Sequence, residues 1–120
     1  MTHSQNSRIK SFLQDQYRDA RSAENAGKIE DAWGHLERAH IVAQGMFAPH
    51  LYSHWRMLAL AAKTSDLREV FGQLMRLALA PLGNLTGRLP IGNTGRSDVS
   101  AFAHMDIPSD LKAILDTQSK

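Results

Sequence analysis

Apolar residues recur every three or four positions through most of the first 80 residues, and this period limits the fold more than any other feature. Such a spacing places apolar side chains on one face of an α-helix, and that face has to be buried. The pattern is interrupted at Gly27, between Gly45 and Pro49, and at residues 64–66. The sequence therefore predicts four helices, over residues 7–26, 30–44, 49–63 and 66–80.

Short connections separate the predicted helices. Gly27 stands where a left-handed residue ends a helix, and Pro49 is typical of a first helical turn. Asp66 and Glu69 have the spacing of a capping box. Helices joined by short loops pack as antiparallel neighbours, so we expect two antiparallel helical hairpins in a tetratricopeptide-like or four-helix arrangement. One tetratricopeptide unit is matched in its small and apolar positions by Ala20, Gly27, Ala32, Leu36 and Ala39.

One face of each helix is predicted to form the core. Trp33 of the second helix and Trp55 of the third are both assigned to it. The apolar ridge of the third helix comprises Leu51, Trp55, Leu58 and Ala62. The apolar face of the fourth helix comprises Leu67, Val70, Phe71, Leu74 and Ala78. We expect these residues to be buried, because removing apolar surface from water stabilises the fold.

Residues 82–108 show no sustained period and contain four glycines and two prolines. Apolar residues such as Leu89, Val99 and Ile107 are too frequent here for a disordered segment. We expect an extended strap across the helices, followed by a short final helix over residues 109–116. The predicted fold is a single all-α domain, residues 1–120, of two helical hairpins with a C-terminal strap and a short final helix.

The composition excludes several classes of function. A 42% hydrophobic content in 120 residues suits one compact core. The chain has no cysteine, which removes disulfides, thiolate metal sites and cysteine catalysis. A net charge of +2 is too small for a dedicated nucleic-acid or membrane-surface protein. The N-terminal segment lacks the apolar run of a signal peptide, and no run is long enough to span a bilayer, so we expect a cytoplasmic protein.

Four of the six histidines lie in the second and third predicted helices and the turn between them. Helical phase places His40 in the middle of the buried face of the second helix, and His35 on the opposite side. Glu37 lies on the flank of that face, within one turn of His40. His50 and His54 are one turn apart on a ridge of the third helix that can approach the second. We expect His35, His3 and His104 to lie on the surface.

These residues predict a metal site. Its candidate ligands are His40, His54, His50 and Glu37, with Met57 as a possible soft neighbour. Neutral imidazole and carboxylate bind Zn²⁺, Cu²⁺, Ni²⁺ or iron without any thiolate. The alternative is a buried hydrogen-bonded network that only sets the register of the helices. In that case the hairpins would form a tetratricopeptide-like interaction module for a protein partner.

Catalysis has little support in the sequence. A single Glu-x-x-His motif is too few for a carboxylate-bridged di-iron centre. The chain has no Gly-x-Ser-x-Gly nucleophile elbow, so no catalytic residue is assigned. The sequence favours a binding protein over an enzyme.

A second candidate site is the loop formed by Gly92, Asn93, Thr94, Gly95 and Arg96. Backbone N–H groups in such a loop can converge on an anion, and Arg96 would add positive charge. The loop lacks the lysine and the spacing of a P-loop. Turn formation is the competing and favoured explanation of its glycines.

Five segments of the chain, HLERAHIVAQ, HWRML, DLREVFGQLMRL, GRLPIGNTG and MDIPSDL, together resemble a family of small bacterial proteins catalogued as a domain of unknown function. The resemblance extends from Tyr17 to Leu115 and is most specific through HWRML and PIGNTG. It implies a shared fold and genes that often lie near heavy-metal resistance and efflux genes. The sequence and the resemblance together predict a small cytoplasmic protein that binds a transition-metal ion in metal handling.

Overall fold

The computed structural model describes residues 3–115, apart from the side chain of His3. The predicted surface position of His3 therefore lies outside the described part. Five helices and no strand are found among the described residues, which confirms the all-α fold. The helices are α1 (His3–Asn25), α2 (Ile29–Ala43), α3 (Phe47–Lys63), α4 (Leu67–Thr86) and α5 (Ser109–Leu115).

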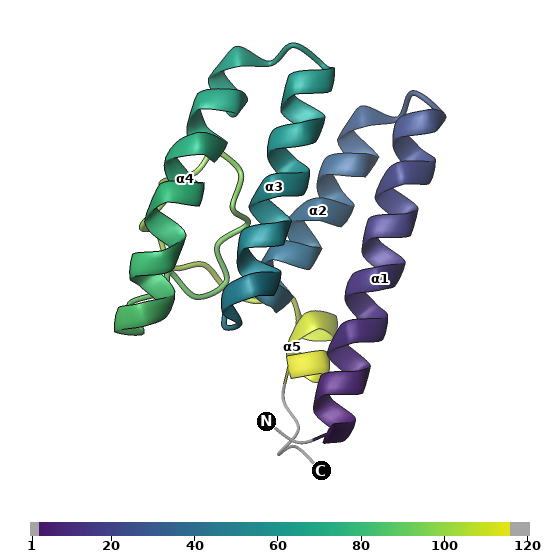
Figure 1. Ribbon diagram of the computed structural model, residues 1–120. Helices are drawn as coiled ribbons and strands as arrows, with labels where there is room; N and C mark the ends of the chain where they lie inside the picture. Colours follow the sequence, from purple (N-terminus) through teal and green to yellow (C-terminus); the bar gives the residue numbers. More distant parts are fainter. Residues whose placement is uncertain (1–2, 116–120) are drawn as a thin grey trace.

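The first four helices form two hairpins, α1 with α2 and α3 with α4 (Figure 1). The hairpins meet where α2 packs against α3, whereas no Cα atom of α1 lies within 8 Å of one in α4. The four helices therefore follow one another in order and do not close into a bundle. The short α5 packs against α1 and α2, where Arg38 forms an ion pair with Asp110.

Local chemistry explains where the helices begin and end. Gly27 has a left-handed φ of +76°, and the N–H of Lys28 donates to the carbonyl of Ala23 over 2.8 Å. This closes α1 with one of its own free carbonyl groups. The Asp66 carboxylate accepts a 3.1 Å hydrogen bond from the N–H of Glu69, which caps α4 as predicted.

The predicted end of the fourth helix at residue 80 is wrong. The helix α4 continues through Pro81 to Thr86 and ends at Gly87, whose φ is +74°. Proline removes one backbone donor but already has a helical φ, so neighbouring contacts can carry the helix past it. The added turn is held by Asn84, whose side-chain Nδ2 donates to the carbonyl of Gln44 over 3.1 Å. The strap therefore covers residues 88–108. In addition, α1 begins four residues earlier than predicted.

The apolar core has two adjoining parts. One lies between the two hairpins and the other between α1, α2 and α5. Trp33 is 2% exposed, as predicted. The buried residues of the first part are Ala20, Ala23, Ala32, Trp33, Leu36, Met57, Leu60 and Ala61. Those of the second part are Ile9, Leu13, Ala39, Ile41, Val42, Ala43 and Leu111. None of the described helices has the length and apolar character needed to cross a membrane.

Two of the predicted core faces are wrong in most of their residues, although Val70 of the α4 face packs against the core. Trp55 is 57% exposed, and Phe71 is 69% exposed. The exposed residues also include Leu67 and Leu74, while α3 instead buries His50, Ser53, His54, Arg56, Met57, Leu60 and Ala61. In α4, the buried residues are Glu69, Gln73, Arg76 and Ala80.

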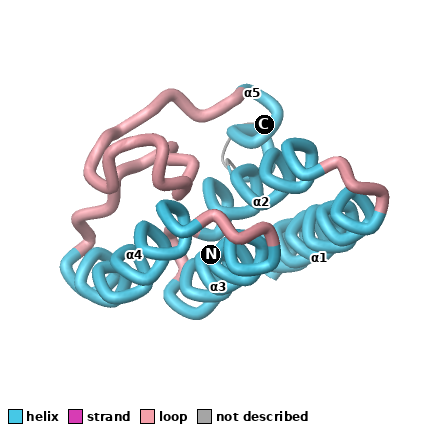
Figure 2. Tube along the Cα trace, turned by 90° about the horizontal axis from the view of Figure 1, so that it is seen from above, coloured by secondary structure: helices cyan, strands magenta, loops and turns pink. Residues whose placement is uncertain are grey.

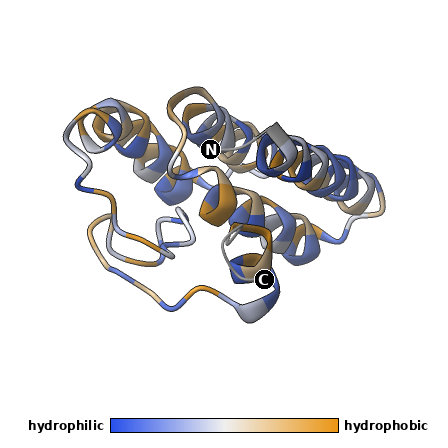
Figure 3. Cartoon of the chain, turned by 90° about the horizontal axis from the view of Figure 1, so that it is seen from below, coloured by the Kyte–Doolittle hydropathy of each residue, from blue (hydrophilic) through white to orange (hydrophobic). Residues whose placement is uncertain are grey.

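The strap explains this exchange of faces on α4. It lies on one side of the helical layer, beside α4 (Figure 2), and mixes polar with apolar residues (Figure 3). Its backbone bonds to polar side chains of α4: the carbonyl of Gly95 accepts from Gln73, and that of Val99 accepts from Arg76. Polar side chains are buried at little cost when they are hydrogen-bonded. The polar face of α4 is therefore inside, because the strap satisfies it.

Candidate metal centre

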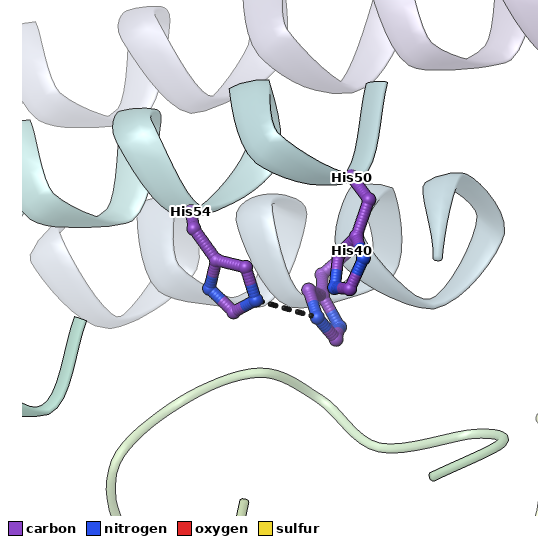
Figure 4. A group of neighbouring side chains, drawn as sticks. All are labelled: His40, His50 and His54. Carbon is purple, nitrogen blue, oxygen red and sulfur yellow. Dashed lines mark hydrogen bonds between the residues drawn. The ribbon is translucent and has the colours of Figure 1, made fainter. Parts of the chain in front are cut away.

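Three histidine rings meet between α2, α3 and the strap. His40 comes from α2, and His50 and His54 come from successive turns of α3 (Figure 4). The strap passes along the open side of the three rings. All three residues are buried, with exposed fractions of 2%, 4% and 3%, and one ligand nitrogen from each lies within 4.8 Å of the others. The Nε2 atoms of His40 and His54 are 3.1 Å apart.

The protonation of His40 follows from its partner in the strap. Its Nδ1 lies 2.8 Å from the backbone carbonyl of Asn93. A carbonyl oxygen only accepts hydrogen bonds, so Nδ1 has to carry the proton. In the neutral ring, Nε2 is then left with its lone pair.

His54 has the same tautomer for a different reason. Its Nδ1 lies 2.7 Å from Oε1 of Gln73. The amide nitrogen of Gln73 donates to the Glu69 carboxylate over 2.8 Å and to the carbonyl of Gly95 over 2.9 Å. These two acceptors fix the orientation of the amide, so its oxygen faces His54 and accepts from Nδ1. The lone pair of His54 is again on Nε2.

His50 completes the set. Its Nδ1 lies 2.7 Å from Oδ1 of Asn84, and the Asn84 amide nitrogen donates to the carbonyl of Gln44. The amide is therefore oriented with its oxygen toward the ring, and His50 donates from Nδ1. Each of the three imidazoles thus has its Nδ1 proton held by an oxygen and its Nε2 free of a proton.

Burial keeps the three rings neutral. It lowers the pKa of His54 to about 4, and the Gln73 hydrogen bond only partly offsets it. Burial likewise lowers the pKa of His50, and it lowers that of His40 well below the usual value, with the neighbouring histidines adding to the effect on His40. At neutral pH, the Nε2 atoms of His40 and His54 are at hydrogen-bond distance without a proton to share. Neutral imidazole nitrogens in this arrangement are a donor set for a divalent transition metal.

Glu37 is not brought to the three histidines. Within the described residues, the group of potential ligand atoms around His40, His50 and His54 contains no carboxylate. The Glu37 carboxylate instead lies 3.4 Å from Arg96 of the strap, which also pairs with Glu30 over 3.0 Å. Met57, the predicted soft neighbour, packs in the core with Trp33 and Leu36.

The loop of residues 92–96 contacts His40 through the Asn93 carbonyl and otherwise uses its polar groups to hold its own turn. Its own side chains accept its backbone N–H groups: Asn93 Oδ1 accepts from Gly95 over 2.8 Å, and Thr94 Oγ1 accepts from Arg96. The Arg96 guanidinium is paired with carboxylates and lies 4.4 Å from the centre of the Trp33 ring. These contacts favour turn formation over anion binding, since the N–H groups of Gly95 and Arg96 and the Arg96 guanidinium already have partners.

Two other histidines lie apart from the centre. His35, which was expected on the solvent side, is half-buried and bonds to Gln16 over 2.8 Å, whereas His104 is exposed as expected.

Sequence reasoning missed the residues that hold the three histidines of the centre. Gln73 and Asn84 support His54 and His50, and both come from α4. A usable pattern does exist, because the polar residues Glu69, Gln73 and Arg76 recur at helical spacing on the face opposite the apolar one.

A cavity of about 400 Å³ opens beside the three rings. His40, His50 and His54 border it, together with the mostly buried Arg76. Much of the remaining wall is apolar and comes from Leu79, Ala80, Leu82, Leu89, Pro90, Ala101 and Phe102. A small molecule could therefore reach the histidine nitrogens.

The fold and the site define a small all-α protein with a buried three-histidine centre. The chain belongs to the family described as Protein of unknown function (DUF3703), whose model matches residues 7–115. The family resemblance inferred from the sequence is confirmed to that extent. No match was found among curated proteins or among solved structures.

Lowered pKa values predict that the metal-free protein loses stability in acid. The unfolded chain takes up protons at its histidines below about pH 6.5, while the folded rings remain neutral until a lower pH. The stability is therefore complete above pH 6.5 and is lost as the pH falls from 6.5 toward 4. For His54 alone, a pKa of about 4 corresponds to a loss of about 3 kcal/mol across this window.

Urea unfolding in the presence of a metal chelator measures this effect, with circular dichroism at a series of pH values between 7.5 and 4. Leucine at position 54 does not titrate, so the variant His54→Leu should show a smaller change of unfolding free energy over the same range. A free energy that is independent of pH in both proteins would show that the buried rings are not held neutral.

Proposed function

We propose that this protein binds one divalent transition-metal ion through the Nε2 atoms of His40, His50 and His54. The observation that carries the proposal is the commitment of all three Nδ1 protons to oxygen acceptors, which leaves an Nε2 lone pair on each of three buried rings whose candidate ligand atoms lie within 4.8 Å of one another. Metal-binding histidines characteristically donate the other ring N–H to a carbonyl or carboxylate oxygen, which fixes the ring and its tautomer.

A purely structural network accounts for these contacts less well. Such a network places a donor opposite each acceptor, because an unpaired buried polar atom costs free energy. The Nε2 atoms of His40 and His54 lie 3.1 Å apart, and a hydrogen bond between them would need a second proton on one ring. Burial opposes that proton. A cation between the rings satisfies the lone pairs without one.

The donor set narrows the choice of ion. Three neutral imidazoles with no carboxylate and no thiolate suit Zn²⁺ or Cu²⁺, and they also suit Ni²⁺. The non-haem iron sites of oxygenases use two histidines and a carboxylate, so iron fits this set less well. Three protein ligands leave a fourth position for water or another ligand, as in zinc sites that are not purely structural.

Metal handling is the role that this centre supports. An ion with an open coordination position beside a cavity can exchange with a ligand that enters from outside, whereas a four-residue cage would retain it. The neighbourhood of heavy-metal resistance genes that the family resemblance implies would suit such a role. Docking of a peptide in the manner of tetratricopeptide repeats has less support, because the strap covers the side of α2 and α4 that faces the histidines.

Metal titration tests the proposal. Protein stripped with a chelator should take up about one equivalent of Zn²⁺ or Co²⁺ at pH 7.5, and Co²⁺ should give the strong visible absorption of a four-coordinate ion. X-ray absorption of the zinc form should show nitrogen neighbours at about 2.0–2.1 Å and no sulfur. Metal at 100 times its Kd should raise the unfolding free energy by about 2.7 kcal/mol. A folded protein that takes up neither ion would leave the three histidines with a structural role.

A further inference from the structure

The cavity beside the histidine centre joins two different kinds of surface. The His40, His50 and His54 rings border it together with the buried Arg76 and the exposed Arg88. Much of the remaining wall is apolar and includes Leu79, Leu82, Leu89 and Phe102. With about 400 Å³, the cavity is within the size range of small-molecule sites, which combine apolar walls with a few polar groups.

Arg76 is a buried cation that contacts no counter-ion in the described part of the chain. It is 8% exposed, and its Nη atoms donate to the backbone carbonyls of Gly72 and Val99. Its Nε has no hydrogen-bond partner among the described residues. Within residues 3–115, no carboxylate oxygen lies within 4.0 Å of this guanidinium. A buried arginine is ordinarily paired, because an uncompensated charge in the interior costs free energy.

Arg96 provides a contrast on the same strap-covered side of the molecule. Its guanidinium lies 3.0 Å from Glu30, 3.4 Å from Glu37 and 3.7 Å from Glu69. Glu30, Glu37 and Glu69 are therefore in contact with Arg96, whereas Glu69 and Asp98 act on Arg76 only from a longer distance. The Arg76 charge, which borders the cavity, has no contacting carboxylate among the described residues and remains available to an anion from outside the chain.

The positive charge of Arg76 also acts on two of the histidines, His40 and His54. Burial is the main cause of the lowered pKa of His54, and the positive charge of Arg76 adds to it. Burial is also the main cause of the lowered pKa of His40, and the positive charge of Arg76 again adds to it. A metal ion at the three Nε2 atoms would add further positive charge to the wall of the cavity.

We infer that the cavity takes a small organic carboxylate, whose carboxylate group fills the open metal position and pairs with Arg76 while its apolar part lies against Leu82 and Phe102. This inference rests on the proposed metal site. Carboxylate is the natural partner of both groups, since it binds divalent metals through oxygen and accepts charge-assisted hydrogen bonds from arginine. The apolar wall selects an organic acid over an inorganic anion.

The test uses the full chain loaded with Co²⁺, titrated with acetate, butyrate and hexanoate at constant ionic strength. Each acid that enters the metal's coordination sphere should change the visible absorption of Co²⁺. Apolar burial is expected to tighten binding by about two- to fourfold for each added methylene that reaches the wall. The variant Arg76→Met should keep one equivalent of Co²⁺ but bind hexanoate at least about tenfold more weakly.

The matched control is Arg68→Met, which makes the same change at an exposed position of α4. Hexanoate affinity should be unchanged in this variant. Arg76→Gln, which can still donate to a backbone carbonyl, replaces Arg76→Met if that variant does not fold.

The outcomes separate the two proposals. Failure of the wild-type protein to bind Co²⁺ overturns the metal site and this inference with it. Uptake of Co²⁺ with no response to any of the three acids overturns the carboxylate site alone. Equal affinity for acetate and hexanoate overturns the apolar part of the site. Equal hexanoate affinity in the wild-type and Arg76 variants overturns the role of Arg76.

Discussion

Replacing His54 by alanine is expected to lower the affinity of the protein for Zn²⁺ by more than about 100-fold while the helices remain folded. Removing only a hydrogen-bond partner behind a metal ligand costs roughly 10–100-fold, and here one of three ligand nitrogens is removed. Competition with a chromophoric zinc chelator measures the affinity, and far-ultraviolet circular dichroism reports the helices. The variant also leaves Oε1 of Gln73 without its donor, which should lower the unfolding free energy by about 1–3 kcal/mol.

His35 provides the matched control for this substitution. It belongs to the same helix as His40, and its Nδ1 bonds to Oε1 of Gln16 over 2.8 Å, away from the three-histidine group. The variant His35→Ala therefore loses one imidazole and one hydrogen bond to a glutamine, as His54→Ala does. Its zinc affinity should equal that of the wild type. Equal losses of affinity in both variants, or unchanged uptake in the His40→Ala, His54→Ala double variant, would place the metal elsewhere.

Replacing Gly95 by alanine is expected to disrupt the centre from the side of the strap. Gly95 has φ +85°, and a Cβ atom built on it would lie 2.6 Å from Cγ and Cδ2 of the His40 ring. The ring cannot simply turn away, because its Nδ1 donates to the carbonyl of Asn93. The left-handed backbone costs about 1–2 kcal/mol for alanine, and overpacking adds about 1–3 kcal/mol. Zinc affinity should fall by about 10–100-fold as His40 loses its position.

The variant Gly87→Ala separates the cost of the left-handed backbone from the cost of overpacking against His40. Gly87 has a similar φ of +74°, but a Cβ atom on it would meet nothing within 4 Å. Gly87→Ala should therefore lose only the roughly 1–2 kcal/mol of backbone strain and keep the wild-type zinc affinity. Urea unfolding and chelator competition on both variants isolate the contact between residue 95 and His40. If Gly95→Ala keeps the affinity of Gly87→Ala, the strap does not position this ligand.

Much of the helical scaffold was predictable from the sequence. The predicted helices and turns rest on interactions between residues a few positions apart, such as the left-handed Gly27 and the cap formed by Asp66. The helical phase of His40 and the one-turn spacing of His50 and His54 likewise describe positions on single helices. A short turn between those helices was enough to predict that the rings approach one another.

Most of the wrong predictions concern residues whose environment depends on parts of the chain that are distant in the sequence. Trp55 and Phe71 stand on strongly apolar faces, and apolarity alone assigned them to the core. The opposite face of α4 is buried because strap residues supply hydrogen-bond partners to Glu69 and Gln73 from more than 20 positions away in the sequence. The spacing of apolar residues along a helix carries no information about a hydrogen-bond partner so far away in the sequence.

The sequence by itself determined the helices, their pairing and the approach of three histidines, because each depends on local spacing and on short connections. Only the tertiary structure decided that Glu37 pairs with Arg96 and does not join the histidine centre. It also decided that Asn93, Gln73 and Asn84 accept the three Nδ1 protons. These contacts join the strap and α4 to α2 and α3 across long separations. The tautomers, and with them the direction of the three lone pairs, follow from those contacts and not from the spacing of the histidines.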